Sequence, residues 1–98
     1  MEMSSGEEEL WEIRGRIDEI DDAIADLLSK RMQYAQQAKD VKVRMNKPLA
    51  DMQREKEVID KWCERARMRK EACGLSEEMM RKIGEFVTHY TLKEELEE

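Results

Sequence analysis

The feature that most constrains the fold is a long apolar stripe with helical periodicity in the first half of the chain. Its residues repeat at alternating intervals of three and four, which is the spacing of one face of an α-helix. The stripe predicts a single amphipathic helix that reaches about residue 44. Its members are Leu10, Ile13, Ile17, Ile20, Ile24, Leu27, Arg31, Ala35, Ala38, Lys42 and Met45.

Local signals indicate where this helix begins and where a loop follows it. The residues from Ser5 to Glu8 have the form of a capping box, which would start the helix. Residues 1–7 are therefore expected to be an N-terminal extension. Pro48 disfavours helical backbone at the residue before it, so residues 45–50 are expected to form a loop.

Two shorter helices are expected after the loop. Asp51 can cap the second helix, and Gly74 is its natural stop signal. Ser76 precedes a third helix that frays into an acidic tail, residues 96–98. No repeat or long linker divides the chain, so residues 1–98 are expected to form one all-α domain. The inward-facing residues expected on the two helices are Val58, Ile59, Trp62, Ala66, Met80, Ile83, Val87 and Tyr90.

The relative lengths of the three helices predict a homodimer. A first helix of roughly 38 residues extends about 57 Å, whereas a compact chain of this size has a radius of gyration of about 12–13 Å. The two later helices are each roughly half as long, so they cannot cover the whole stripe. The uncovered length favours a second copy of the chain in an intertwined, obligate homodimer.

Charge and cysteine usage narrow the range of partners and compartments. The net charge is −6 with both signs mixed along the chain, which argues against nucleic acid or an anionic membrane as the main partner. No apolar run approaches membrane-spanning length, and the acidic N-terminus does not have the pattern of a signal peptide. Cys63 and Cys73 lie about 15 Å apart along one expected helix. That separation excludes a disulfide between them, so free thiols and a cytoplasmic location are expected.

Two cations interrupt the apolar stripe. Arg31 and Lys42 lie within about 20° of the same helix face and about 16 Å apart along it. The small side chains of Ala35 and Ala38 between them leave space. The two cations could bind a small dianion together, or each could extend to solvent or pair with a carboxylate of a neighbouring helix.

Arg14 flanks the same stripe about 25 Å before Arg31, too far to share a pocket within one subunit. If two first helices cross antiparallel near Asp22 and Ala23, each Arg14 approaches the partner's Arg31. The alternative is that Arg14 is a solvated surface residue.

Further polar residues cluster near the ends of the second and third helices. A cap explains Asp51, and the helix dipole explains Glu55, but Arg54 is unfavourable in a first turn and suggests an anionic partner. Thr91 and Glu95 share a face near the end of the third helix, where Glu95 could also belong to a solvated tail.

The sequence lacks the residues that several kinds of active site require. His89 is the only histidine, the cysteines lack the spacing of metal ligands, and no glycine-rich phosphate loop occurs. We therefore expect no metal, no cofactor and no covalent nucleophile.

Several motifs at fixed spacing resemble those of the all-helical class of chorismate mutases. The resemblance covers roughly residues 8–96 and is carried by the stretch 13–21, Leu27-Leu28 followed by Arg31, then Lys42, Pro48 and the stretch 51–55. It implies interlocked dimers of three-helix subunits, with two equivalent sites that each contain residues of both chains.

The resemblance also implies a role for each site residue. Arg14 of one subunit joins Arg31 and Lys42 of the other at the two carboxylates of chorismate. Lys42 and Glu95 face the ether oxygen, and the spacing from Thr91 favours Glu95 over Glu94.

The other implied contacts surround these. Glu55 and the backbone at Asp51 hold the ring hydroxyl, Arg54 organises the site, and Thr91 contacts a carboxylate.

The implied reaction is the rearrangement of chorismate to prephenate in tyrosine and phenylalanine biosynthesis, which needs no covalent intermediate. Glu95 must be protonated to donate to the ether oxygen, so activity is expected to fall as the pH rises. Two alternatives remain. One is an isochorismate–pyruvate lyase that uses the same cationic pocket, and the other is a non-catalytic helical dimerisation or regulatory module.

Overall fold

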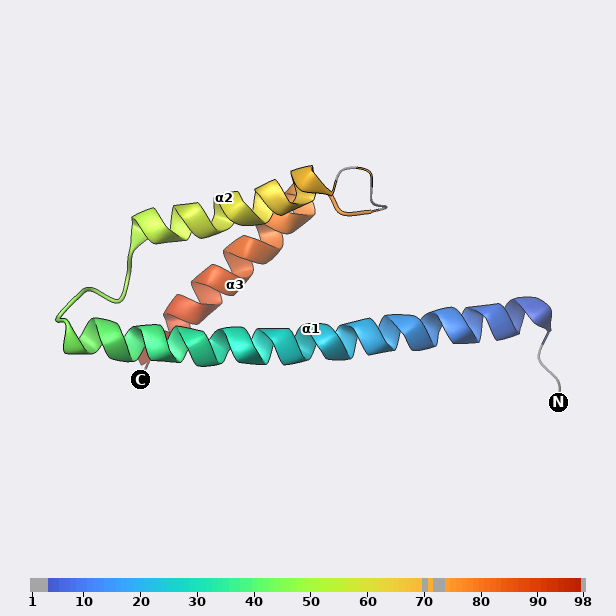
Figure 1. The fold of residues 1–98 in the computed structure, drawn as a ribbon, viewed down its shortest axis with the longest axis horizontal. Coiled ribbons are helices and arrows are strands. Elements are labelled where there is room, and N and C mark those ends of the chain that lie inside the picture. Colours follow the sequence, from blue (N-terminus) through green and yellow to red (C-terminus); the bar gives the residue numbers. More distant parts are fainter. Residues whose placement is uncertain (1–3, 70, 72–73, 98) are drawn as a thin grey trace. The chain divides into compact units, whose positions relative to one another are not determined.

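The computed structural model describes residues 4–69, 71 and 74–97. These residues form three helices and no strand: α1 (Ser5–Arg44), α2 (Met52–Met68) and α3 (Glu77–Glu97) (Figure 1). The helices contain 40, 17 and 21 residues. The expected all-α class, with one long and two shorter helices, is confirmed. The chain forms two compact units, residues 1–34 and residues 35–98, which we describe separately.

The first helix begins with a capping box one residue earlier than expected. Ser4 Oγ accepts a hydrogen bond from the backbone N–H of Glu7 at 3.1 Å, and the Ser4 N–H donates to Glu7 Oε2 at 3.3 Å. The predicted start at Ser5 with Glu8 is therefore wrong in register. Serines at positions 4 and 5 and glutamates at 7 and 8 satisfy the same pattern in either register, so the pattern alone could not select between them.

In the first unit, the apolar stripe of α1 is exposed along its whole length. None of the residues 4–34 is buried. The leucine and isoleucine side chains of this unit are between 40% exposed, at Leu28, and 62% exposed, at Leu27. A single helix has no second element on which to bury such a face, so its apolar residues remain available for another surface.

A short loop joins the end of α1 to a capped start of α2. Asn46 adopts the left-handed backbone region with φ of 55°, a conformation that asparagine tolerates better than most residues. The N–H of Lys47 donates to the carbonyl of Lys42 at 2.8 Å and closes the end of the helix. Asp51 Oδ1 accepts from the Arg54 N–H at 3.0 Å, which confirms Asp51 as the cap of α2.

The second helix ends earlier than predicted. Its last residue is Met68, and Arg69 caps it with its N–H donating to the carbonyl of Ala66 at 3.1 Å. Gly74, expected to stop the helix, instead turns the chain before α3 with φ of 81°. Beyond Ala66 the helix has no further buried side chain to hold it against α3. Cys73, expected on the same helix as Cys63, lies outside the described residues.

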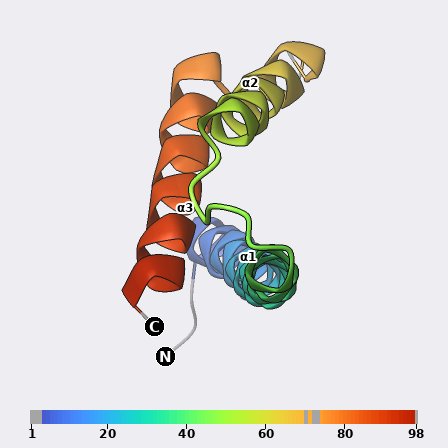
Figure 2. The same cartoon turned by 90° about the vertical axis from the view of Figure 1, so that its left-hand side faces the viewer.

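Helices α2 and α3 pack closely against each other (Figure 2). A Cβ added to Gly84 of α3 would lie 2.8 Å from Trp62 Cγ of α2, so only glycine allows this approach. At the other end of the pair, Arg67 forms an ion pair with Glu77. Among the described residues, the buried apolar core is small and consists of Cys63, Ala66 and Met80.

The third helix begins as predicted but buries a partly different face. Ser76 Oγ accepts from the N–H of Met79 at 3.0 Å, so the expected start is confirmed. Tyr90, expected to face inward, is 45% exposed, and that prediction is wrong. The buried residues of α3 are Met80, Gly84, Thr88 and Glu95. Small and polar residues at helical spacing therefore occupy the face that the apolar pattern assigned to Tyr90.

Candidate functional site

In the second unit, the end of α1 meets the end of α3 through an ion pair. Lys42 Nζ lies 3.6 Å from Glu95 Oε2, and the exposed fractions of the two side chains are 28% and 9%. Lys42 Nζ also donates to the carbonyl oxygen of Leu49 at 3.0 Å. The ammonium is thus held by the loop after α1 as well as by α3. A cation and a carboxylate in this position can present charge to a small ligand.

The end of α3 is ordered as a helix where a frayed tail was expected. The helix continues to Glu97, and Glu95 is 8% exposed. Thr91 lies one turn before Glu95 and is half-buried, and its hydroxyl donates to the carbonyl of Val87 at 2.7 Å. Thr91 and Glu95 therefore share a face of α3, as their spacing predicts.

Two further buried polar residues near this ion pair were missed at the level of sequence. Lys39 is 9% exposed, and within α1, which is described throughout, it alone is buried. Thr88 is 8% exposed and lies two turns before Glu95. The available signal was spacing, since Lys39 lies one turn before Lys42 and Thr88 lies on the face of Glu95.

The three candidates at the start of α2 have different surroundings. Asp51 accepts the capping hydrogen bond described above, and Glu55 is half-buried in the first turn. Arg54 Nη1 lies 3.7 Å from Glu57 Oε2, with side chains 59% and 51% exposed. An exposed pair of this kind contributes little to stability, so Arg54 could exchange its carboxylate partner for an anionic ligand at small cost.

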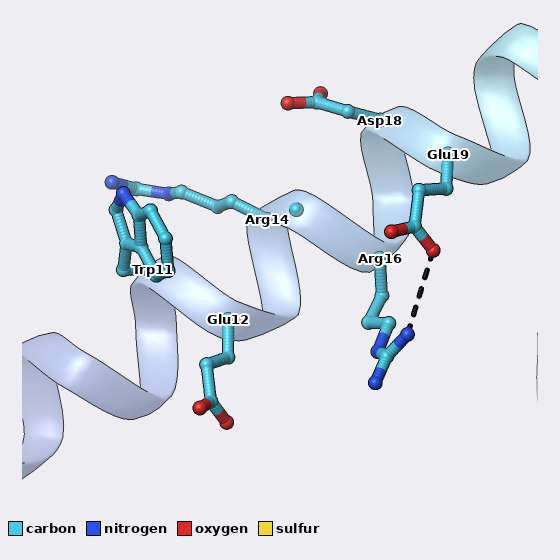
Figure 3. Close-up of a pocket in the computed structure, with 7 residues that line it drawn as sticks. Trp11, Glu12, Arg14, Arg16, Asp18 and Glu19 are labelled. Atoms are coloured by element: carbon cyan, nitrogen blue, oxygen red, sulfur yellow. Dashed lines mark hydrogen bonds and ion pairs between the residues drawn. The ribbon is translucent and has the colours of Figure 1, made fainter.

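The first unit contains the other two candidate cations. Arg14 is exposed and extends on the same side of α1 as Trp11, beside a surface depression at Gly15 (Figure 3). Arg31 is half-buried and takes part in an interaction of its own. The structure thus brings Lys42 and Glu95 together. The joint pocket of Arg14, Arg31 and Lys42 stays a prediction.

In the described part of the chain, no group of three or more His, Cys, Asp or Glu side chains is placed to hold a metal ion. None of the described helices has an apolar stretch that could cross a bilayer. On the exposed side of α3, the charge of Glu94 and a hydrogen bond to it raise the pKa of Tyr90.

The described residues define a small all-helical protein with a cation–carboxylate pair at the end of its long helix. Residues 13–96 match the chorismate mutase type II family, and the chain belongs to that family. The match spans most of the chain and includes every candidate residue above. No curated protein and no solved structure matches the chain.

Proposed function

We propose that this protein is a chorismate mutase, which rearranges chorismate to prephenate without a covalent intermediate. The observation that carries the proposal is the pairing of Lys42 with the buried Glu95 at 3.6 Å, in a chain of this family. The reaction is unimolecular. The protein needs only to hold the substrate in its reactive conformation and to stabilise the charge that develops as the C–O bond breaks.

Lys42 and Glu95 are proposed to act together on the ether oxygen. Negative charge grows on that oxygen in the transition state, and the Lys42 ammonium stabilises it. Glu95 contributes when it is protonated, because a neutral carboxyl can donate a hydrogen bond whereas a carboxylate would repel the developing charge. Lys42 Nζ and Glu95 Oε2 are 3.6 Å apart, so both can reach one oxygen atom that lies between them.

The remaining candidates are proposed to bind the rest of the substrate. Arg31 and the partner's Arg14 bind the carboxylates together with Lys42. The Thr91 hydroxyl contacts one carboxylate after it rotates away from the carbonyl of Val87, to which it donates in the free protein. The backbone at Asp51 and the carboxylate of Glu55 hold the ring hydroxyl, with Arg54 ordering the site.

This arrangement requires a homodimer with shared sites. The exposed stripe of α1 supports it, because eight aliphatic or aromatic side chains from Leu10 to Leu28 lie uncovered on one helix. Burying apolar surface on that scale against a second copy is strongly favourable. The same proposal places the enzyme in the cytoplasm, in the pathway to tyrosine and phenylalanine.

The test is chorismate consumption by the purified chain, with prephenate measured as the product. We expect turnover, and we expect Lys42→Ala to lower kcat by about 10²–10³-fold, as the removal of one transition-state donor does elsewhere. Lys47→Ala is the matched control, since Lys47 is an exposed lysine in the following loop. A wild-type protein that leaves chorismate unchanged would refute the proposal.

The same assay separates the two alternative functions. Pyruvate release from isochorismate, without prephenate formation from chorismate, would identify a lyase on this scaffold. If Arg31→Ala and Lys42→Ala change only assembly and stability, and neither substrate is consumed by the wild type, the chain is a dimerisation or regulatory module.

A further inference from the structure

The hydroxyl of Thr88 is a buried polar group that the proposed contacts leave unexplained. Thr88 is 8% exposed, and its Oγ1 has no hydrogen-bond partner among the residues that the structure describes. Thr91, on the next turn, shows how a helical threonine usually satisfies itself, by donating to the carbonyl four residues earlier at 2.7 Å. A buried hydroxyl without a partner is destabilising, so it calls for a specific reason.

The position of Thr88 on α3 connects it to the proposed site. At 100° per residue, Thr88 lies about 20° from Glu95 and about 60° from Thr91 around the helix axis. Along the axis it lies about 4.5 Å from Thr91 and about 10 Å from Glu95. A small cyclic diacid can span that length. The three side chains therefore form one polar row on the buried face of α3.

The neighbours of Thr88 show where this row begins. Gly84, one turn earlier on the same face, packs against Trp62 of α2. Glu95, two turns later, pairs with Lys42 of α1. Thr88 thus lies where the buried face of α3 passes from its contact with α2 to its contact with the end of α1, at the inner end of the row.

We propose that Thr88 is a further substrate-binding residue, whose hydroxyl donates a hydrogen bond to a carboxylate oxygen of the small cyclic diacid beside Thr91. The proposal rests on the proposed function, because it takes the substrate to bind along Thr91 and Glu95. A carboxylate offers about four lone-pair sites, so it can accept from a threonine hydroxyl as well as from cations. The unpartnered hydroxyl lowers the stability of the free protein and is satisfied when the substrate is bound.

The experiment compares two substitutions that divide the threonine side chain into its parts. Thr88→Val keeps the shape and removes the hydroxyl, and Thr88→Ser keeps the hydroxyl and removes the methyl. We expect Thr88→Val to raise the KM for chorismate about tenfold, with kcat within about threefold of wild type, as loss of one hydrogen bond to a charged group predicts. We expect Thr88→Ser to keep the wild-type KM, and the Tm of unliganded Thr88→Val to equal or exceed that of wild type.

Each other outcome has a defined meaning. Wild-type turnover with an unchanged KM in Thr88→Val would overturn the Thr88 assignment and leave the proposed function standing. An equal rise in KM for both variants would show a packing role and would also overturn it. A higher dimer dissociation constant for Thr88→Val, measured by sedimentation with KM unchanged, would assign the hydroxyl to the subunit interface. No turnover by the wild-type protein would overturn the proposed function, and this assignment with it.

Discussion

The two units of this protein differ in which kinds of side chain are exposed and which are buried. The first unit carries the most regular apolar pattern of the chain, yet none of the residues 4–34 is buried. The second unit has a less regular pattern, and there Lys39, Thr88 and Glu95 are as buried as the apolar core residue Met80. The exposed periodic face of the first unit therefore supports the proposed dimer surface, whereas the buried polar residues of the second unit support the proposed ligand site.

The largest expected effect comes from placing a charge on the stripe of the first unit. Ile20→Asp would put a carboxylate into the proposed dimer interface, where desolvation costs several kcal/mol. We expect dissociation into monomers and a loss of roughly 10³-fold in kcat/KM, measured by sedimentation and turnover. A 10³-fold loss in kcat/KM corresponds to about 4 kcal/mol of lost transition-state stabilisation, which is comparable with the desolvation cost.

Ser29→Asp is the matched control for this substitution, since it introduces the same charge on the opposite face of α1. A dimeric, active Ile20→Asp protein would remove the contrast between the two units.

The next effect concerns the hydrogen-bond donor that Glu95 is proposed to supply in the second unit. Glu95→Ala removes this donor and should lower kcat by about 10²–10³-fold, as the loss of one transition-state donor does elsewhere. Glu95→Gln keeps a neutral donor at the same position and should retain most of the turnover. Equal losses of kcat in the two variants would mean that Glu95 does not face the reacting oxygen.

The close approach of α2 and α3 predicts a loss of stability without a change in assembly. In Gly84→Ala, the new Cβ would lie 2.8 Å from Trp62 Cγ, so one of the helices must shift. We expect a loss of about 2 kcal/mol in the free energy of unfolding, as for other overpacked cores, measured by urea denaturation. Gly15→Ala is the control, because a Cβ there meets nothing within 4 Å. Equal changes in the two variants would refute the packing argument.

The smallest expected effect is the loss of the cap of α2. Asp51→Ala removes the acceptor for the Arg54 N–H and should destabilise the protein by about 1 kcal/mol. Asp51→Ser keeps a capping oxygen and should recover most of that stability. Because the proposed substrate contact at Asp51 uses the backbone, Asp51→Ser should also keep the wild-type KM. A large rise in KM for Asp51→Ser would instead assign a substrate contact to the carboxylate.

The sequence predicted the presence of the three helices more accurately than the residues at which they begin and end. The periodicity of the stripe correctly carried α1 to Arg44, and Asp51 was a correct cap, because both depend on contacts within a few residues. Gly74 was a misleading stop signal because the end of α2 depends on where packing against α3 runs out. Tyr90 was misplaced because an apolar pattern gives no weight to buried glycine or threonine.

The candidate site was predictable in part. The resemblance to the family's motifs identified Lys42 and Glu95 as site residues, and the structure places their side chains together. The apolar pattern alone would have assigned Glu95 to a solvated tail. Lys39 and Thr88 were missed because a charge or a hydroxyl on a helix is usually solvated. Only the structure shows that these two are buried.

The hydrogen bond from Lys42 to the carbonyl of Leu49 has a consequence for the rate of binding and reaction. A lysine side chain ordinarily loses considerable rotamer freedom when a ligand fixes it. Here the carbonyl of Leu49 accepts a hydrogen bond from the ammonium, and the ion pair with Glu95 of α3 restricts it further. Much of the entropy of immobilising this side chain is therefore lost during folding, before any substrate arrives, and the other N–H groups of the ammonium can donate to an incoming oxygen.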